Sequence, residues 1–168
     1  MEILKKAYEI INQKQDEIIG TLQQFIAIPS VSVRTPGDKP FGEDVDRAFK
    51  FMLEKAENDG FETFNADNYG GHIDFRGESG EVMGILGHID VVPEGRGWDY
   101  EPYSATVSDG RIYGRGAIDD KGPVIASYYA MKALKSAGFK PDKTVRLILG
   151  LDEETDWEGM EYYFTKVR

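Results

Sequence analysis

Three short segments of the chain carry side chains that could bind a divalent metal ion. They are GHIDVVP (87–93, with His88 and Asp90), GRGAIDDKG (114–122, with Asp119 and Asp120) and LDEE (151–154, with Glu153 and Glu154). Imidazole nitrogen and carboxylate oxygen are ligands that zinc and similar ions accept, and a catalytic site leaves one coordination position open for water. Because each segment comes after a strand-like run, we expect them to assemble a hydrolytic metal site at the ends of strands.

The first segment places a histidine two residues before an aspartate. On an extended strand, His88 and Asp90 would therefore point to the same face. A metal-binding histidine usually donates its other ring N–H to a carboxylate, which fixes the tautomer and raises the basicity of the ligand. Taken alone, a core histidine beside a turn aspartate explains the pair better, because short motifs have many false matches.

The two acidic pairs also have a purely structural explanation. Both precede predicted helices, and acids near a helix N-terminus are stabilised by its dipole and its free N–H groups. In a metal site, one carboxylate of Asp119-Asp120 could instead span two ions about 3.5–4 Å apart. Glu153-Glu154 could divide the roles of ligand and general base. Neither pair is specific without the other segments.

The remaining candidates are histidine and aromatic side chains. His72, the other histidine, is interpreted as a structural or supporting residue. Trp98 and Trp157 are interpreted as packing residues, and Tyr128 and Tyr129 as part of the core of a helix.

Hydrophobic periodicity predicts four helices and several strands. Helical spacing covers 4–26 (with a possible break near Gly20), 45–56, a stretch opened by Gly122-Pro123 and ended by Gly138, and 156–166. Strand-like patterns cover 61–80, a buried run at 82–86, a hairpin at 105–113 that turns at Asp109-Gly110, and a buried run at 144–151. Because helices alternate with apolar strands, we expect an α/β fold with a largely parallel central sheet flanked by helices. Such sheets bind ligands at the carboxyl ends of their strands.

Composition excludes several classes of protein. The chain of 168 residues is long enough for one domain, and its 40% apolar content is that of a globular protein. Its net charge of -10 disfavours nucleic acid and anionic membranes as partners. It has no cysteine, no recognisable signal peptide and no apolar run near the ~20 residues that span a membrane. We therefore expect a cytoplasmic protein.

Taken together, the three segments closely resemble the zinc metallopeptidase family that includes aminoacylase, glutamate carboxypeptidase and succinyl-diaminopimelate desuccinylase. The tract 87–154 looks most like the bacterial dipeptidase V branch. FIAIPSVS (25–32) and NADNYGGHIDF (65–75) also fit, so the resemblance covers almost the whole chain.

The resemblance implies a role for each acidic and imidazole residue. His88 would bind one zinc ion, and Asp90 would orient the imidazole ring of His88. Asp119 would bridge two zinc ions, and Glu154 would bind the second. Glu153 would be the general base. The resemblance also implies a non-prolyl cis peptide after Asp119.

The sequence departs from the family downstream of Glu154. Family members are longer and supply a further acidic ligand, a histidine ligand near the C-terminus and an inserted lid domain, whereas this chain has no histidine beyond His88. We therefore expect 1–168 to be the N-terminal part of a catalytic domain. The isolated fragment should bind zinc weakly, lack peptidase activity and tend to associate through surface that the remainder would cover.

The leading interpretation is a zinc-dependent dipeptidase that acts on dipeptides or small peptides. Alternatives are an amide deacylase of the same superfamily, such as a deacetylase or desuccinylase, and a non-catalytic remnant. A two-metal phosphoesterase fits less well, because the chain has only two histidines. The preferred dipeptide, the native metal, the oligomeric state and the origin of the truncation stay open at this point.

Overall fold

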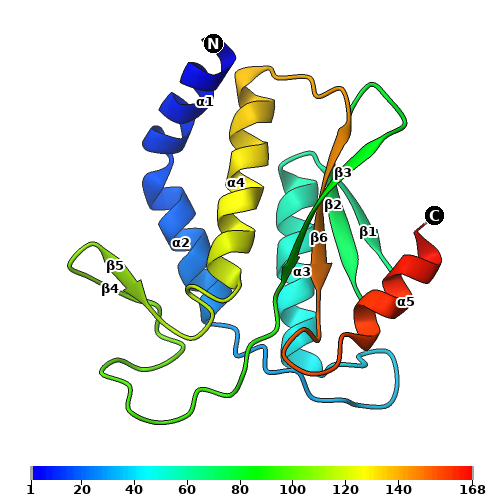
Figure 1. The fold of residues 1–168 in the computed structure, drawn as a ribbon. Coiled ribbons are helices and arrows are strands. Elements are labelled where there is room, and N and C mark those ends of the chain that lie inside the picture. The colour runs from blue at the N-terminus through cyan, green and yellow to red at the C-terminus, as the bar shows by residue number, and fades with distance from the viewer. Residues whose placement is uncertain (1, 168) are drawn as a thin grey trace.

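The structure is a computed structural model that describes residues 2–167 (Figure 1). Its helices are α1 (Glu2–Gln13), α2 (Gln15–Ile26), α3 (Glu43–Asn58), α4 (Lys121–Ala137) and α5 (Glu158–Lys166). Its strands are β1 (Glu62–Asn65), β2 (Gly71–Phe75), β3 (Val82–His88), β4 (Thr106–Ser108), β5 (Arg111–Tyr113) and β6 (Thr144–Gly150). The predicted hairpin is present, since β4 and β5 pair across a turn where Asp109 and Gly110 have φ of 49° and 71°.

The main sheet within residues 2–167 has four strands in the order β1-β2-β6-β3. β1 pairs antiparallel with β2, and β2 with β6, whereas β3 and β6 are parallel. The α/β class is confirmed, but the prediction of a largely parallel sheet is wrong. The short connection 66–70 makes β1 and β2 a hairpin and leaves no room for a crossover helix. β3 and β6, which are joined through α4, form the parallel pair.

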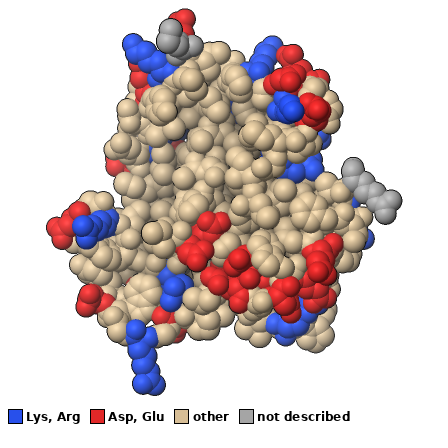
Figure 2. Space-filling view, in the orientation of Figure 1, with Lys and Arg blue, Asp and Glu red and all other residues tan. Residues whose placement is uncertain are grey.

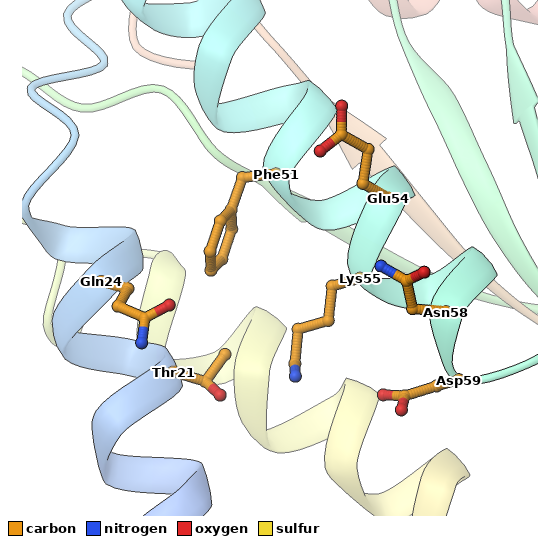
Figure 3. Close-up of a pocket in the computed structure, with 7 residues that line it drawn as sticks. All are labelled: Thr21, Gln24, Phe51, Glu54, Lys55, Asn58 and Asp59. Atoms are coloured by element: carbon orange, nitrogen blue, oxygen red, sulfur yellow. The ribbon is translucent and has the colours of Figure 1, made fainter.

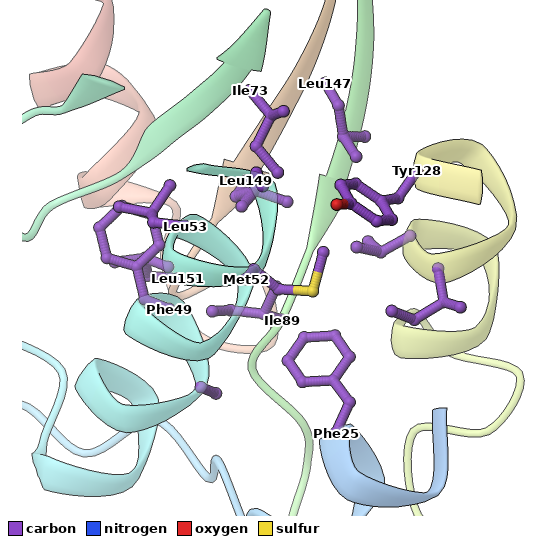
Figure 4. Packing of buried hydrophobic residues seen from close by; sticks show 14 of the residues in the cluster. Phe25, Phe49, Met52, Leu53, Ile73, Ile89, Tyr128, Leu147, Leu149 and Leu151 are labelled. Carbon is purple, nitrogen blue, oxygen red and sulfur yellow. The ribbon is translucent and has the colours of Figure 1, made fainter. Parts of the chain in front are cut away.

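The apolar core lies between one face of the sheet and helices α2, α3 and α4 (Figure 4). Its central side chains, all fully buried, are Phe25, Phe49, Met52, Ile73, Tyr128, Leu147 and Leu149. Each such side chain contributes about 1.5–3 kcal/mol through burial. On the other face of the sheet, Met160 and Tyr163 of α5 pack with Ile148 of β6. β6 is therefore packed against apolar side chains on both of its faces.

β3 is not the buried strand that its apolar sequence predicts. Val82, Met83 and Leu86 are 49%, 49% and 53% exposed. β3 is an edge strand of the described sheet, and α4 packs against only one of its faces. The apolar run therefore predicted the strand correctly but not its burial, which depends on neighbours in space.

The helix ends show where local signals decide and where they do not. α4 ends at Gly138, whose φ of 88° is the left-handed value that favours glycine. The N-terminal helix breaks at Lys14 rather than near Gly20, which lies inside α2, where a glycine costs only about 1 kcal/mol. α5 begins at Glu158, after Trp157 in a left-handed conformation, so it starts later than predicted. None of the helices within residues 2–167 combines the length and apolarity needed to cross a membrane.

Candidate metal centre

The residues singled out in the sequence come together at the carboxyl ends of β3 and β6. His88, the last residue of β3, lies opposite Gly150, the last residue of β6. Because the two strands are parallel, the segments that continue from them leave the sheet at the same edge. Glu153 and Glu154 come after β6 at that edge. On the face shown in Figure 2, acidic side chains gather in the lower half, over the region where these two strands end.

Asp119 and Asp120 reach the same edge from the start of α4, which packs against β3. Asp119 Oδ1 lies 3.1 Å from Nε2 of His88. The peptide bond between Asp119 and Asp120 is cis, as the resemblance implied. Asp120 occupies the N-cap position of α4, but its side chain makes no capping hydrogen bond within the described chain. Helix capping therefore does not account for this acidic pair.

His88, Glu153 and Glu154 form a group that could hold a metal ion. One ligand atom from each residue lies within 4.8 Å of the other two. Glu153 Oε2 is 3.8 Å from His88 Nε2. Asp119 is not part of this three-residue group, and its side chain is 69% exposed, although it contacts His88. The structure thus brings Glu153 and Glu154 close to His88, and it places Asp119 in contact with His88 but outside this group.

Asp90 links the segment after β3 to the loop after β6 by hydrogen bonds. Its side chain is fully buried, and its two carboxylate oxygens accept the backbone N–H groups of Glu153 at 3.1 Å and Glu154 at 3.0 Å. The same carboxylate lies 3.3 Å from Nδ1 of His88, and the backbone oxygen of Asp90 lies 3.1 Å from that nitrogen. Asp90 therefore fixes the orientation of the ring and leaves Nε2 facing the other acids.

Asp120 has a contact that sequence reasoning missed. Its Oδ2 accepts the backbone N–H of His88 at 3.1 Å. This approach depends on Gly87, because a Cβ at that position would lie 2.8 Å from both Asp120 Oδ2 and Val124 Cγ2. The glycine before the histidine was visible in the sequence, but its partner 33 residues later was not.

The electrostatics of the cluster favour a cation. Burial lowers the pKa of His88, but its hydrogen bond to Asp90 and the charges of Asp90 and Asp120 outweigh burial and raise the pKa to about 9. Burial raises the pKa of Asp120. Burial and the charge of Asp119 raise the pKa of Glu154. Imidazole and carboxylate donors that crowd negative charge in this way fit a zinc-type divalent ion.

Two buried charged residues beside the acidic pairs were also missed. Lys121, the residue after Asp120, is fully buried, and burial lowers its pKa to about 7. Asp152, which precedes Glu153, is fully buried and accepts the N–H of Gly159 at 3.0 Å. Burial raises the pKa of Asp152 to about 6. Fully buried charged residues are rare, but the sequence does not show burial, and the only signal was the position of both residues next to metal-ligand candidates.

A separate surface pocket lies between α2 and α3, away from the acidic cluster (Figure 3). Its volume is about 280 Å³, and the lining residues are Thr21, Gln24, Phe51, Glu54, Lys55, Asn58 and Asp59. No candidate metal ligand is among these lining residues. The pocket therefore gives no support for a second part of the metal centre.

The family is decided by the match of residues 84–168, just over half of the chain, to the model of Peptidase family M20/M25/M40. The chain belongs to this family. That stretch contains all three metal-ligand segments, and members of the family are metal-dependent peptidases. The resemblance inferred from the sequence is thereby confirmed at the level of the family and its dipeptidase branch.

Individual relatives agree with this family. The chain is 48% identical over 159 residues to the "Putative dipeptidase YtjP" of Bacillus subtilis (93% of this chain, 34% of that protein). It is 45% identical over 158 residues to the "Beta-Ala-Xaa dipeptidase" of Lactobacillus delbrueckii subsp. lactis (92% and 33%). The crystal structure of human carnosine dipeptidase 1 matches with a TM-score of 0.84 and 27% identity, over 99% of this chain and 38% of that one. The chain spans about a third of the length of the curated relatives it matches.

Proposed function

We propose that these residues belong to a zinc-dependent dipeptidase and that 1–168 form the N-terminal part of its catalytic domain. The observation that carries the proposal is the convergence of His88, Glu153 and Glu154 at the ends of two parallel strands. Relatives at 41–48% identity carry dipeptidase names, which favours a dipeptide substrate over the acylated amines of the deacylases.

In this proposal His88, Asp119 and Glu154 would hold two zinc ions, and Asp119 would be a ligand common to both. Asp119 Oδ1 already lies 3.1 Å from Nε2, the His88 nitrogen that faces the acids. Bound zinc would polarise the peptide carbonyl and acidify a water molecule.

Glu153 moves the proton. Its side chain is 35% exposed, so its carboxylate can reach both solvent and a bound peptide. It takes a proton from the attacking water and passes it to the leaving amine. The N–H of Glu153 is held by Asp90, which also orients the ring of His88. Asp90 therefore keeps the base and the histidine ligand in a fixed relation.

The first test is titration of the 168-residue chain with Zn²⁺ by calorimetry. We expect weak binding that His88→Ala removes. Because the relatives that carry dipeptidase names are about three times as long, we expect the 168-residue chain alone to hydrolyse no β-alanyl or α-linked dipeptide. In the complete protein, Glu153→Ala should abolish hydrolysis and leave zinc bound.

Two results would overturn this proposal. Equal zinc affinity in the wild type and His88→Ala would show that His88 is not a metal ligand and refute the proposed metal centre. Full hydrolysis by the complete Glu153→Ala protein would show that Glu153 is not the general base. Turnover by the 168-residue chain that disappears in Glu153→Ala would support the dipeptidase and show that these residues suffice.

A further inference from the structure

Lys121 comes directly after the Asp119-Asp120 pair and turns into the protein, away from solvent. Its side chain is fully buried. Nζ donates hydrogen bonds to the carbonyl oxygens of Phe25 at 3.0 Å and Ile28 at 2.6 Å, and lies 5.1 Å from the centre of the Phe25 ring. Burial of an ammonium group is costly unless its donors are satisfied, and here two of the three N–H donors bind backbone carbonyls, one in the last turn of α2 and one just after it.

The end of α2 is a suitable place for this ammonium group. The last carbonyl oxygens of a helix carry partial negative charge, which stabilises a cation. The aliphatic part of Lys121 passes close to Gly116, where a Cβ would lie 3.1 Å from Lys121 Cδ and 3.0 Å from Val91 Cγ1. The ammonium group is therefore bound by backbone oxygens, and a glycine leaves room for the stem that leads to it.

The segment after α2 is in turn fixed to the residues after His88. Ser30 Oγ donates to the carbonyl oxygen of Ile89 at 2.7 Å, and the N–H of Val91 donates to the carbonyl oxygen of Ser30 at 3.0 Å. Val31 and Val91 form a parallel bridge. The position of the α2 end thus sets the position of the strand extension that carries Asp90.

These contacts connect the start of α4 with the end of α2, the end of α2 with the segment after His88, and His88 with Asp120. Asp120, next to Lys121, accepts the N–H of His88 at 3.1 Å. We propose that Lys121 is a positioning residue for the metal centre, because it joins the start of α4 to the end of α2 and so sets where Asp119 and Asp120 lie relative to His88. The inference rests on the proposed function, whose metal ligands it positions.

Lys135, at the far end of α4, offers a matched control. Its Nζ also donates to two carbonyl oxygens, those of Asp59 and Gly60, and lies 4.4 Å from the centre of the Phe61 ring. Lys121→Met and Lys135→Met therefore remove the same kind of contacts at opposite ends of one helix, Lys121 being fully buried and Lys135 partly buried. A general loss of stability should be common to both variants, whereas a loss of positioning should occur only in Lys121→Met.

The direct readout is hydrogen exchange at the backbone N–H of His88, which bonds to Asp120. We expect this N–H to exchange at least tenfold faster in Lys121→Met, relative to core amides, and to be unchanged in Lys135→Met. Calorimetry with Zn²⁺ should show at least tenfold weaker binding for Lys121→Met and a change within twofold for Lys135→Met. Wild-type exchange and affinity in Lys121→Met would overturn the inference.

A chemical variant separates the ammonium group from the bulk of the side chain. Since the chain has no cysteine, Lys121→Cys supplies a unique thiol that can be alkylated in denaturant and refolded. Bromoethylamine restores an amine at the length of lysine, and bromopropane places a methyl group there. The aminoethyl form should regain His88 protection and zinc affinity, and the propyl form should not. Equal behaviour of the two folded forms, or failure of both the propyl form and Lys121→Met to fold, would overturn the specific role.

The two proposals fail in different ways. A chain whose His88 exchange responds to Lys121→Met but which binds no zinc would refute the proposed function and leave the positioning role. A chain that binds zinc equally well with and without the ammonium group of residue 121 would refute the positioning role alone.

Discussion

The tetrapeptide Gly-His-Ile-Asp occurs twice in this chain, at 71–74 and at 87–90, and the two copies have opposite electrostatic environments. Both lie at strands, and both histidines are 7% exposed. Both aspartates are buried. Sequence and burial are therefore matched, and the difference between the copies comes from what surrounds them.

The copy at 71–74 lies within β2 and faces cations. Asp74 accepts two hydrogen bonds from Arg146, both of 2.8 Å, and His72 Nδ1 lies 2.8 Å from the hydroxyl of Tyr163. Burial lowers the pKa of His72 to about 4, since the effects of Arg146 and Arg76 oppose that of Asp74. With this pKa His72 is neutral near pH 7, and its contact with Tyr163 agrees with the structural alternative of the sequence analysis.

The copy at 87–90 lies at the end of β3 and faces acids. Asp90 is bound by backbone N–H groups, which leave its negative charge in place, whereas Arg146 neutralises Asp74. A strand end also leaves Nε2 of His88 open toward Glu153, where no strand continues. The comparison teaches that position on the strand and the charge of its partners, rather than the tetrapeptide itself, decide whether a histidine lies among possible metal ligands.

The largest effect on stability should come from removing the carboxylate of the copy at 71–74. Asp74→Asn leaves the guanidinium of Arg146, which is 13% exposed, without its ion pair, so we expect a loss of about 3–5 kcal/mol in the free energy of unfolding. Urea denaturation measures this loss. Glu62→Gln, which removes an exposed partner of Arg76, should cost much less, because ion pairs in solvent contribute little. Similar small losses in both variants would contradict the role assigned to Asp74.

Substituting each histidine in turn tests whether only the copy at 87–90 contributes to zinc binding. His88→Asn should weaken zinc binding at least about 100-fold, because it removes the imidazole donor from the group with Glu153 and Glu154. His72→Asn should leave the zinc affinity of the folded chain within twofold. Calorimetric titration with Zn²⁺ measures both, and an equal effect of the two substitutions would erase the distinction between the copies.

A smaller loss of zinc affinity should result from changing the aspartate of the second copy. Asp90→Asn keeps the size of the side chain but turns an amide nitrogen toward one of the N–H groups of Glu153 or Glu154. We expect zinc binding to weaken by about 10–100-fold. The folded Asp74→Asn variant serves as the control, and its zinc affinity should be that of the wild type.

The pH dependence of stability should report on His72. Its pKa falls from an ordinary value of 6.5 to about 4 in the folded chain, so the unfolded chain binds more protons between these values. Stability should therefore decrease as the pH falls from about 6.5 to about 4. Urea denaturation at several pH values should show a smaller decrease for His72→Gln, and an identical slope would contradict the buried neutral histidine.

The smallest expected effect concerns the strands that carry the two copies. β2 is an interior strand, whereas β3 exposes Val82, Met83 and Leu86 at an edge of the described sheet. Exposed apolar edge strands promote association, and a lysine on the edge opposes it. Leu86→Lys should reduce concentration-dependent association in sedimentation experiments. Leu4→Lys, on the exposed part of α1, should reduce it less.

Local sequence signals predicted most of the elements, and the resemblance indicated which segments would lie near His88. Gly138 ends α4, and Asp109-Gly110 marks the hairpin, whereas Pro123 is the third residue of α4, which begins at Lys121 rather than at the predicted Gly122-Pro123. The pairing of β1 with β2 was missed because alternation of helices and strands does not specify which strands pair. Asp120, Lys121 and Asp152 could not be assigned roles, because their partners lie far away in sequence and burial of a charge has no local signature.

Trp157 gives the loop after β6 an optical property. Its ring lies against Gly150, where a Cβ would be 2.7 Å from Cζ3, and its backbone N–H donates to the carbonyl oxygen of Asp152 at 3.2 Å. The indole is therefore attached to the same turn as Glu153 and Glu154. Trp98→Phe would leave it as the sole tryptophan fluorophore, since the chain has two tryptophans. Its emission would then report, in real time, any rearrangement of that turn as an ion enters.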